Sequence, residues 1–110
     1  MNRLYLIGNL TADPVLAATA SGISVCTFSL AVNQPGSKQA DGQNGVTYFR
    51  CSVWGAQGEN CARFLKKGSK VFVCGEVKAS AYTSRDGTSR ASLEVSCREV
   101  EFLSSGEQKA

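Results

Sequence analysis

The chain has 110 residues, of which 43% are hydrophobic and 19% are charged. This length fits one domain and excludes an enzyme with separate cofactor and substrate domains, while the composition excludes disorder along the whole chain. The formal net charge of +3 favours an anionic partner only if the basic side chains gather on one face.

The first part of the chain contains two predicted β-strands. Arg3–Ile7 is a short β-rich run, and Ile23–Val32 is a longer one whose apolar alternation changes phase after Val25. Such a phase change predicts a β-bulge, which would let the sheet bend into a barrel. Asn33–Gly45 has no apolar periodicity and is rich in Gly, Gln and Asn, which predicts an exposed, mobile loop.

Val46–Trp54 is a third predicted strand, and its strict alternation sorts the side chains onto two faces. The apolar face carries Phe49, Cys51 and Val53. The opposite, mixed face carries Tyr48, Arg50, Ser52 and Trp54. At ~3.3 Å per residue, the four side chains of the mixed face extend along about 20 Å of the strand. Because the apolar face already supplies the core, another surface or a ligand must cover the mixed face.

After Gly55 the apolar spacing becomes helical. Cys61, Phe64 and Leu65 fall at positions i, i+3 and i+4, which predicts one short helix with these three side chains on its apolar face. Lys66-Lys67-Gly68 would form the last turn of this helix and its C-terminal cap.

Two further strands are predicted at Lys70–Tyr82 and Ala91–Leu103, joined by a hairpin at Arg85-Asp86-Gly87-Thr88 because an Asp-Gly step favours a tight turn. The order of strand, strand, strand, helix, strand, strand predicts an all-β protein. It suits a five-stranded Greek-key barrel of the OB type, with one short helix between strands three and four. Residues 1–104 would form this domain, and residues 105–110 would form a disordered tail.

Catalytic and metal-binding motifs are missing from the sequence. It has no His, no Gly-x-Ser-x-Gly motif and no Gly-x-x-x-x-Gly-Lys motif, so we expect no catalytic residues. The five cysteines are odd in number and widely spaced, which predicts small buried side chains and no metal site. The apolar runs are far shorter than the roughly 20 residues that span a bilayer, and there is no signal peptide pattern. We therefore expect a cytoplasmic protein with no membrane partner.

The mixed face of the third predicted strand indicates a binding surface. Tyr48 and Trp54 suit base stacking, which contributes roughly 1–3 kcal/mol per base, and Arg50 between them suits a phosphate or the plane of a base. The same side chains could instead pack against a partner subunit or a second sheet, as in a purely structural oligomerisation domain.

A second group of basic and aromatic residues follows in the predicted hairpin. Lys78 and Tyr82 share a face of the fourth strand, and Arg85 and Arg90 come next along the chain. Cations beside an aromatic suit a groove that follows a nucleic-acid strand, whereas each cation alone would be ordinary surface charge. Lys67 is either a further phosphate contact or a cation that meets the helix dipole.

Four segments together resemble the bacterial single-stranded DNA-binding protein family. They are the opening MNRLYLIGNLTADPVL, the stretch CTFSLAVN, the segment YFRCSVWGAQGENCARFLKKGSKVFVCGEV and the hairpin AYTSRDGTSR. The resemblance implies an OB-fold homotetramer, a dimer of dimers, that binds and protects single-stranded DNA without sequence preference during replication, recombination and repair. It also implies a nucleoid-associated protein that is not an enzyme and needs no cofactor.

The resemblance also assigns roles to individual residues. Base stacking falls on Tyr48, Trp54 and Tyr82, and basic contacts fall on Arg3, Arg50, Lys67 and Lys78. The predicted hairpin adds Arg85 and Arg90 as phosphate contacts. The first strand would supply a pairing edge for the tetramer.

Two departures from the family pattern change the expected binding. Gln34-Pro35-Gly36 stands where many members carry a further aromatic, so we expect weaker binding or a shorter footprint. The sequence ends at Lys109-Ala110 without the acidic tip, closed by a Phe, that recruits replication and repair proteins, so we do not expect such recruitment. This ending indicates either a truncated chain or a short form from a phage, a plasmid or another mobile element. A primosome-type or RNA-binding OB-fold protein, which would use similar side chains, is the alternative function.

Overall fold

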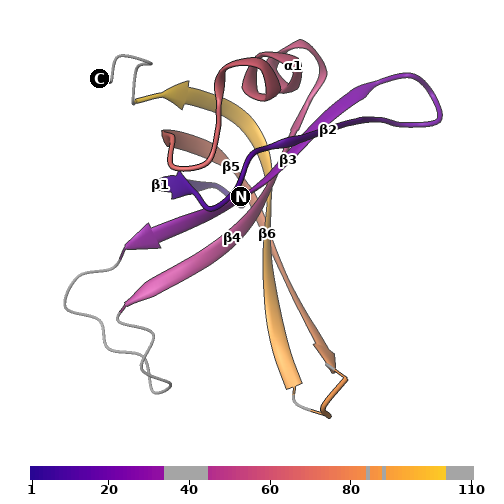
Figure 1. Ribbon diagram of the computed structural model, residues 1–110. Helices are drawn as coiled ribbons and strands as arrows, with labels where there is room; N and C mark the ends of the chain where they lie inside the picture. The colour runs from indigo at the N-terminus through magenta and orange to yellow at the C-terminus, as the bar shows by residue number, and fades with distance from the viewer. Residues whose placement is uncertain (34–44, 84, 88, 104–110) are drawn as a thin grey trace.

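The computed structural model describes residues 1–33, 45–83, 85–87 and 89–103, and of residues 82 and 89–91 it describes the backbone alone. Within these ranges the chain forms six strands and one helix. They are β1 (Leu4–Leu10), β2 (Val15–Ala18), β3 (Ser24–Asn33), β4 (Val46–Trp54), α1 (Gly55–Phe64), β5 (Lys70–Thr83) and β6 (Ser89–Phe102). Figure 1 shows the strands curving around a common centre, with α1 at one end.

The strands pair in the order β1-β5-β6-β4-β3-β2, and β1 also pairs with β3. This additional pairing, at Asn9↔Ala31 and Leu10↔Leu30, lies beyond the predicted end of the first strand at Ile7. It closes five of the described strands into a barrel and leaves β2 outside. β4 and β6 run parallel, and the other described pairs are antiparallel. A closed barrel with this strand order and a helix between β4 and β5 is an OB-fold, so the predicted fold class is confirmed.

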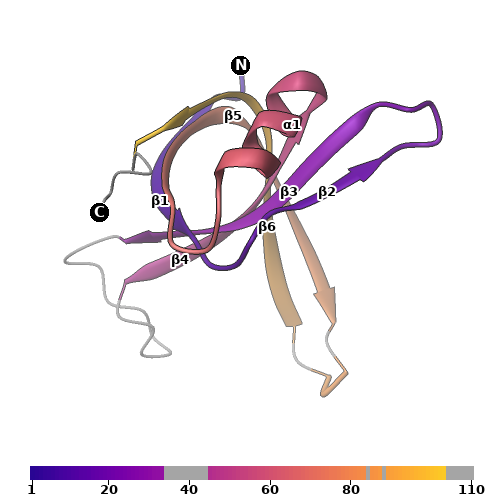
Figure 2. The ribbon, with the colours of Figure 1, turned by 45° about the horizontal axis from the view of Figure 1, so that its top comes forward.

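β2 is a strand that the sequence did not predict. Its four residues, VLAA, are all exposed and pair with β3 from Val15↔Thr27 to Ala18↔Ser24. A short strand that is exposed on both faces shows no alternation of apolar and polar residues. Figure 2 shows β2 and β3 extending away from the barrel as a two-stranded arm.

The bulge predicted in the second strand is wrong. β3 pairs with β4 in an unbroken register from Val25↔Trp54 to Asn33↔Val46. The apolar phase changes because Val25 lies on the outer face of the sheet beside Trp54, and because Ile23 precedes β3 and is half exposed.

A register shift does occur between β5 and β6. Between Cys74 and Gly75 the pairing moves by one residue, which leaves Arg98 of β6 as the extra residue of a bulge. A Cβ atom at Gly75 would overlap the backbone of β6, so this close approach requires glycine. The side chain of Gln57 on α1 forms two hydrogen bonds with the backbone of β6 beside this bulge. Its Nε2 donates to the carbonyl of Arg98 at 3.2 Å, and its Oε1 accepts from the amide of Val100 at 3.1 Å.

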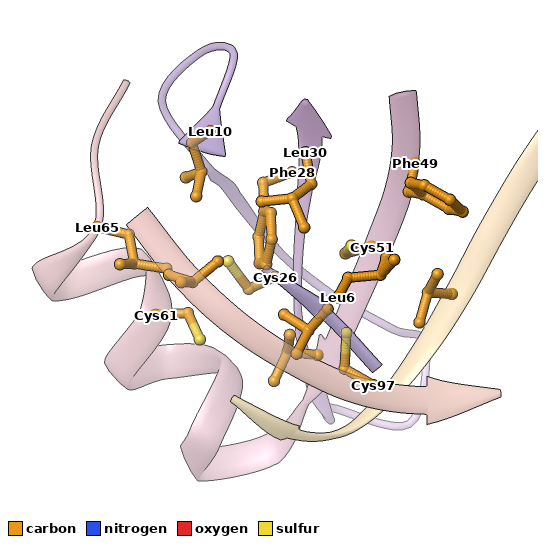
Figure 3. Close-up of a cluster of buried hydrophobic side chains, with 14 of the residues drawn as sticks. Leu6, Leu10, Cys26, Phe28, Leu30, Phe49, Cys51, Cys61, Leu65 and Cys97 are labelled. Atoms are coloured by element: carbon orange, nitrogen blue, oxygen red, sulfur yellow. The ribbon is translucent and has the colours of Figure 1, made fainter. Parts of the chain in front are cut away.

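The core is formed by apolar side chains from the five barrel strands and from α1. Figure 3 shows this cluster, in which side chains from β1, β3, β4, β6 and α1 meet inside the barrel. Phe49, Cys51 and Val53 are all buried, so the predicted apolar face of β4 is confirmed. The five cysteines are free thiols and are buried, as predicted.

The helix α1 is shorter than predicted and presents a different face to the core. It ends at Phe64, and the amide of Leu65 donates to the carbonyl of Cys61 at 2.9 Å. Gly58, Cys61 and Leu65 are buried, whereas Phe64 is 61% exposed. The prediction that Phe64 lies on the core face is therefore wrong. Gly58 takes that place because a residue without a side chain lets α1 approach the backbone of Val53 closely.

Candidate functional site

The outer face of β4 carries two exposed aromatic side chains. Tyr48 is 53% exposed and Trp54 is 48% exposed. Arg50, which lies between them along the strand, is also exposed, and Ser52 is half-buried. The predicted mixed face therefore lies on the outside of the barrel, and the described part of the structure leaves about half of each aromatic residue exposed.

Trp54 lines a groove between β4, β5 and β6, with a volume of about 450 Å³. The three strands contribute Ser52 and Trp54 from β4, Glu76 and Lys78 from β5, and Glu94 and Ser96 from β6. They meet there because β6 pairs with β4 on one side and with β5 on the other. The groove therefore joins a flat aromatic surface at Trp54 to a cation at Lys78.

Cross-strand pairing places two of the predicted cations in one row. Arg50 of β4 lies opposite Glu94 of β6, and Glu94 lies opposite Lys78 of β5. With neighbouring strands about 4.8 Å apart, the backbones at Arg50 and Lys78 are roughly 10 Å apart. Both side chains are exposed, so an anionic ligand that lies across the strands can contact both.

The N-terminal segment is fixed at the rim of the groove by Asn2. The Nδ2 of Asn2 donates to the carbonyl of Val77 at 2.8 Å, and its Oδ1 accepts from the amide of Val77 at 3.2 Å. The side-chain amide of Asn2 thus forms the two hydrogen bonds that a backbone partner of Val77 would form. Asn2 also lines the groove. Arg3, a predicted phosphate contact, is the next residue and is exposed.

Lys67 is not among the residues that line the groove. Its backbone amide donates to the Oδ1 of Asp13 at 2.9 Å, so this segment packs beside the turn between β1 and β2. Asp13 and Arg50 both line a second hollow, with a volume of about 220 Å³. Lys66-Lys67 follows the end of α1, so the prediction that this pair lies in the last helical turn is wrong.

The hairpin between β5 and β6 carries the remaining predicted contacts. Arg85 is exposed in its turn. Backbone pairing joins Tyr82 to Arg90, but both side chains lie outside the described part of the structure. The predicted loop is described only at its two ends, and the predicted tail at 105–110 lies outside the described residues.

The buried thiols do not offer surface nucleophiles. Burial raises the pKa of Cys61 to about 12, and a hydrogen bond with Cys97, together with burial, raises the pKa of Cys51. These thiols are protonated at neutral pH and enclosed in the core. In the described ranges, no group of three or more His, Cys, Asp or Glu side chains lies close enough together to hold a metal ion. No helix in this part of the chain is long and apolar enough to cross a membrane.

Sequence reasoning missed six residues that line the groove, among them Asn2, Glu76 and Glu94. Glu94 reaches the groove through the parallel pairing of β4 with β6, and Asn2 reaches it through side-chain bonds to β5. Both depend on contacts between residues far apart in the sequence. For Glu76 the sequence does carry a signal. Glu76 lies two residues before Lys78 on the same strand, so the two side chains share a face.

Comparison with known proteins agrees with this fold. Residues 1–103 match the single-strand binding protein family. The single-stranded DNA-binding protein 3 of Listeria innocua is 42% identical over 110 residues, which cover 100% of this chain and 68% of that protein. The single-stranded DNA-binding protein of Halalkalibacterium halodurans is 41% identical over 103 residues, covering 94% of this chain and 61% of the relative. The single-stranded DNA-binding protein of Clostridium tetani is 40% identical over 111 residues, which cover 100% of this chain and 75% of that protein.

The matched region is therefore nearly all of this chain, and the chain spans 61% to 75% of the length of these three relatives. A family match of this extent, on a closed barrel with the OB strand order, leaves one conclusion: the chain belongs to the single-strand binding protein family.

Proposed function

We propose that this protein binds single-stranded DNA without sequence preference and thereby protects it during replication, recombination and repair. One observation carries the proposal. Two aromatic side chains, Tyr48 and Trp54, are half exposed on the outer face of β4 on either side of Arg50, and Trp54 opens into a groove that holds Lys78. Binding of this kind involves no catalysis and no cofactor.

The chemistry of the surface suits a ligand that alternates flat bases with phosphates. Base stacking on an aromatic ring contributes roughly 1–3 kcal/mol per base, and it tolerates any sequence because every base has a flat face. The proposed stacking residues are Tyr48, Trp54 and Tyr82. The proposed phosphate contacts are Arg3, Arg50, Lys67, Lys78, Arg85 and Arg90. Each phosphate neutralised should add about −0.7 to the slope of log K against log salt.

We also propose that the binding domain, residues 1–104, assembles as a homotetramer built from two dimers, with residues 105–110 as a tail. Support comes from β1. Tyr5 is 61% exposed and Ile7 is 51% exposed on its outer face, where the ring of Tyr5 stacks on Phe72 with centroids 6.2 Å apart. β1 pairs with β5 along most of its length but with β3 only from Asn9 onward. The remaining edge of β1 suits pairing with a second copy.

The proposal is tested by titrating the protein with a long oligo-dT at low and high salt while following tryptophan fluorescence. Trp54 is the one tryptophan in the sequence, so any change in emission reports on this face. We expect strong quenching at saturation and weaker affinity at high salt. Unchanged emission, together with no binding in an independent assay, would contradict the proposal. A matched RNA oligonucleotide is then added as a competitor. An RNA-binding protein would release the DNA and bind the RNA, whereas a protein specific for single-stranded DNA would keep the DNA.

A further inference from the structure

Two carboxylates line the groove that we propose as the DNA-binding site. Glu76 has a partner, since its Oε2 lies 3.6 Å from the Nη1 of Arg98. Glu94 forms no ion pair with any side chain that the structure describes. The two carboxylates therefore differ, because no described side chain forms an ion pair that balances the negative charge of Glu94.

The position of Glu94 relative to the cations is fixed by the sheet. It lies opposite Lys78 on one side and opposite Arg50 on the other, so a carboxylate stands between two proposed phosphate contacts. All three side chains are exposed. Residues directly opposite each other on neighbouring strands have side chains on the same face, with Cβ atoms about 5 Å apart.

Such a carboxylate has two possible effects on ligand binding. It could hold the two cations in place for a phosphate, or it could compete with the phosphate for them. The first effect requires close ion pairs, and the distances from Glu94 to Lys78 and Arg50 exceed those of an ion pair. The second requires proximity alone, because a phosphate held by either cation comes within a Debye length of the Glu94 charge.

We infer that Glu94 limits the affinity of the groove for the phosphates of single-stranded DNA and so speeds release of the strand. The inference rests on the proposed function. Glu94 repels a phosphate bound at Arg50 or Lys78, and it partly neutralises both cations in the free protein. The groove thus binds a polyanion with less than its full positive charge.

The test compares the wild-type protein with Glu94→Gln, which removes the charge and keeps the shape. Glu101→Gln is the matched control. Glu101 is exposed on the same strand, pairs with Phe72 and lies seven residues from Glu94, which is about 23 Å along β6. Equilibrium affinity and dissociation rate are measured with fluorescent oligo-dT at several salt concentrations. Light scattering checks that all variants have the same oligomeric state.

We expect Glu94→Gln to bind roughly three- to tenfold more tightly at low salt, mainly through slower dissociation, and Glu101→Gln to bind like the wild type. The slope of log K against log salt should also become steeper, because the groove without the Glu94 charge attracts the phosphates more strongly through Arg50 and Lys78. In the background of Lys78→Gln, the gain from Glu94→Gln should shrink.

Two results would overturn the inference in different ways. If the wild type binds oligo-dT and Glu94→Gln binds equally or more weakly, Glu94 does not limit affinity, and the proposed function stands. If none of the proteins binds oligo-dT, the proposed function fails and this inference fails with it.

Discussion

At the scale of single residues, the outer face of β4 combines exposed aromatic rings with a cation, and the hydrophobic core needs neither. Trp54 and Tyr48 leave about half of their surface in water, and Arg50 lies between them. Exposed aromatic surface of this size contributes little to the stability of the monomer, because burial is what makes aromatic rings stabilising. Its removal should therefore affect ligand binding more than folding.

Replacing Trp54 with Ala tests this directly. We expect a loss of about 1–3 kcal/mol in binding to single-stranded DNA, which is about a fivefold or larger rise in Kd, with little change in melting temperature. Fluorescence anisotropy with labelled oligo-dT measures the Kd, and circular dichroism measures the melting temperature. Phe64→Ala is the control, since Phe64 is also exposed but lies on α1, outside the groove. Equal losses in the two variants would contradict the assignment of this face.

At the scale of elements, the bulge between β5 and β6 lies next to the groove, because Gly75 directly precedes Glu76, which lines it. Arg98 is the extra residue of this bulge, and the side chain of Gln57 forms hydrogen bonds with its carbonyl and with the amide of Val100. α1 is thus joined to the strand that crosses from the barrel into the projecting hairpin (Figure 1). The hairpin carries Lys78 and Glu94, so the helix helps to position one wall of the groove.

Gln57→Ala should lower the free energy of unfolding by about 1–2 kcal/mol, because the carbonyl of Arg98 and the amide of Val100 lose their partner. Urea denaturation measures this change. Asn60→Ala on the same helix is the control and should change the free energy much less, since Asn60 is exposed. Equal stability of Gln57→Ala and the wild type would show that water replaces the two hydrogen bonds at no cost.

The same elements show what could be predicted from the sequence. The two faces of β4 were predictable because one face is buried and the other exposed, so the alternation is strict. β2 was not, because both of its faces are exposed. The sequence wrongly predicts a bulge in β3 because Val25 is apolar on an outer face. The true bulge at Arg98 depends on how β5 and β6 align.

Part of the candidate site was predictable for the same reason. Tyr48, Arg50 and Trp54 share one strand, so local alternation places them together. Glu94 and Asn2 come to the groove through pairings between distant segments, which no local pattern encodes.

At the scale of the whole molecule, the groove and the exposed part of β1 are separate surfaces. Trp54 and Lys78 line the groove, whereas Tyr5 and Ile7 lie on the outer face of β1 and do not line it. A protein with this division can associate through β1 while its groove stays open to a strand of DNA. Association would then place several grooves on one particle, which raises the effective concentration of each for the same strand.

Ile7→Asp should therefore prevent assembly without unfolding the barrel, because a charge on an exposed apolar face opposes association but costs the monomer little. Sedimentation velocity measures the assembly state. Ile23→Asp is a closely matched control, since Ile23 is 50% exposed and Ile7 is 51% exposed, but Ile23 lies in the turn that joins β2 to β3. A wild-type monomer, or an Ile7→Asp variant that still assembles, would contradict the role of β1.

The most direct test of the DNA-binding face is photochemical cross-linking of the wild-type protein to an oligonucleotide that contains iododeoxyuridine, with the attached residues identified by mass spectrometry. We predict cross-links at Trp54 and Tyr48, whose exposed rings lie on the outer face of β4. Cross-links confined to Tyr5 or to Phe64, which are exposed on other surfaces, would show that DNA binds elsewhere and would contradict the assignment of this face.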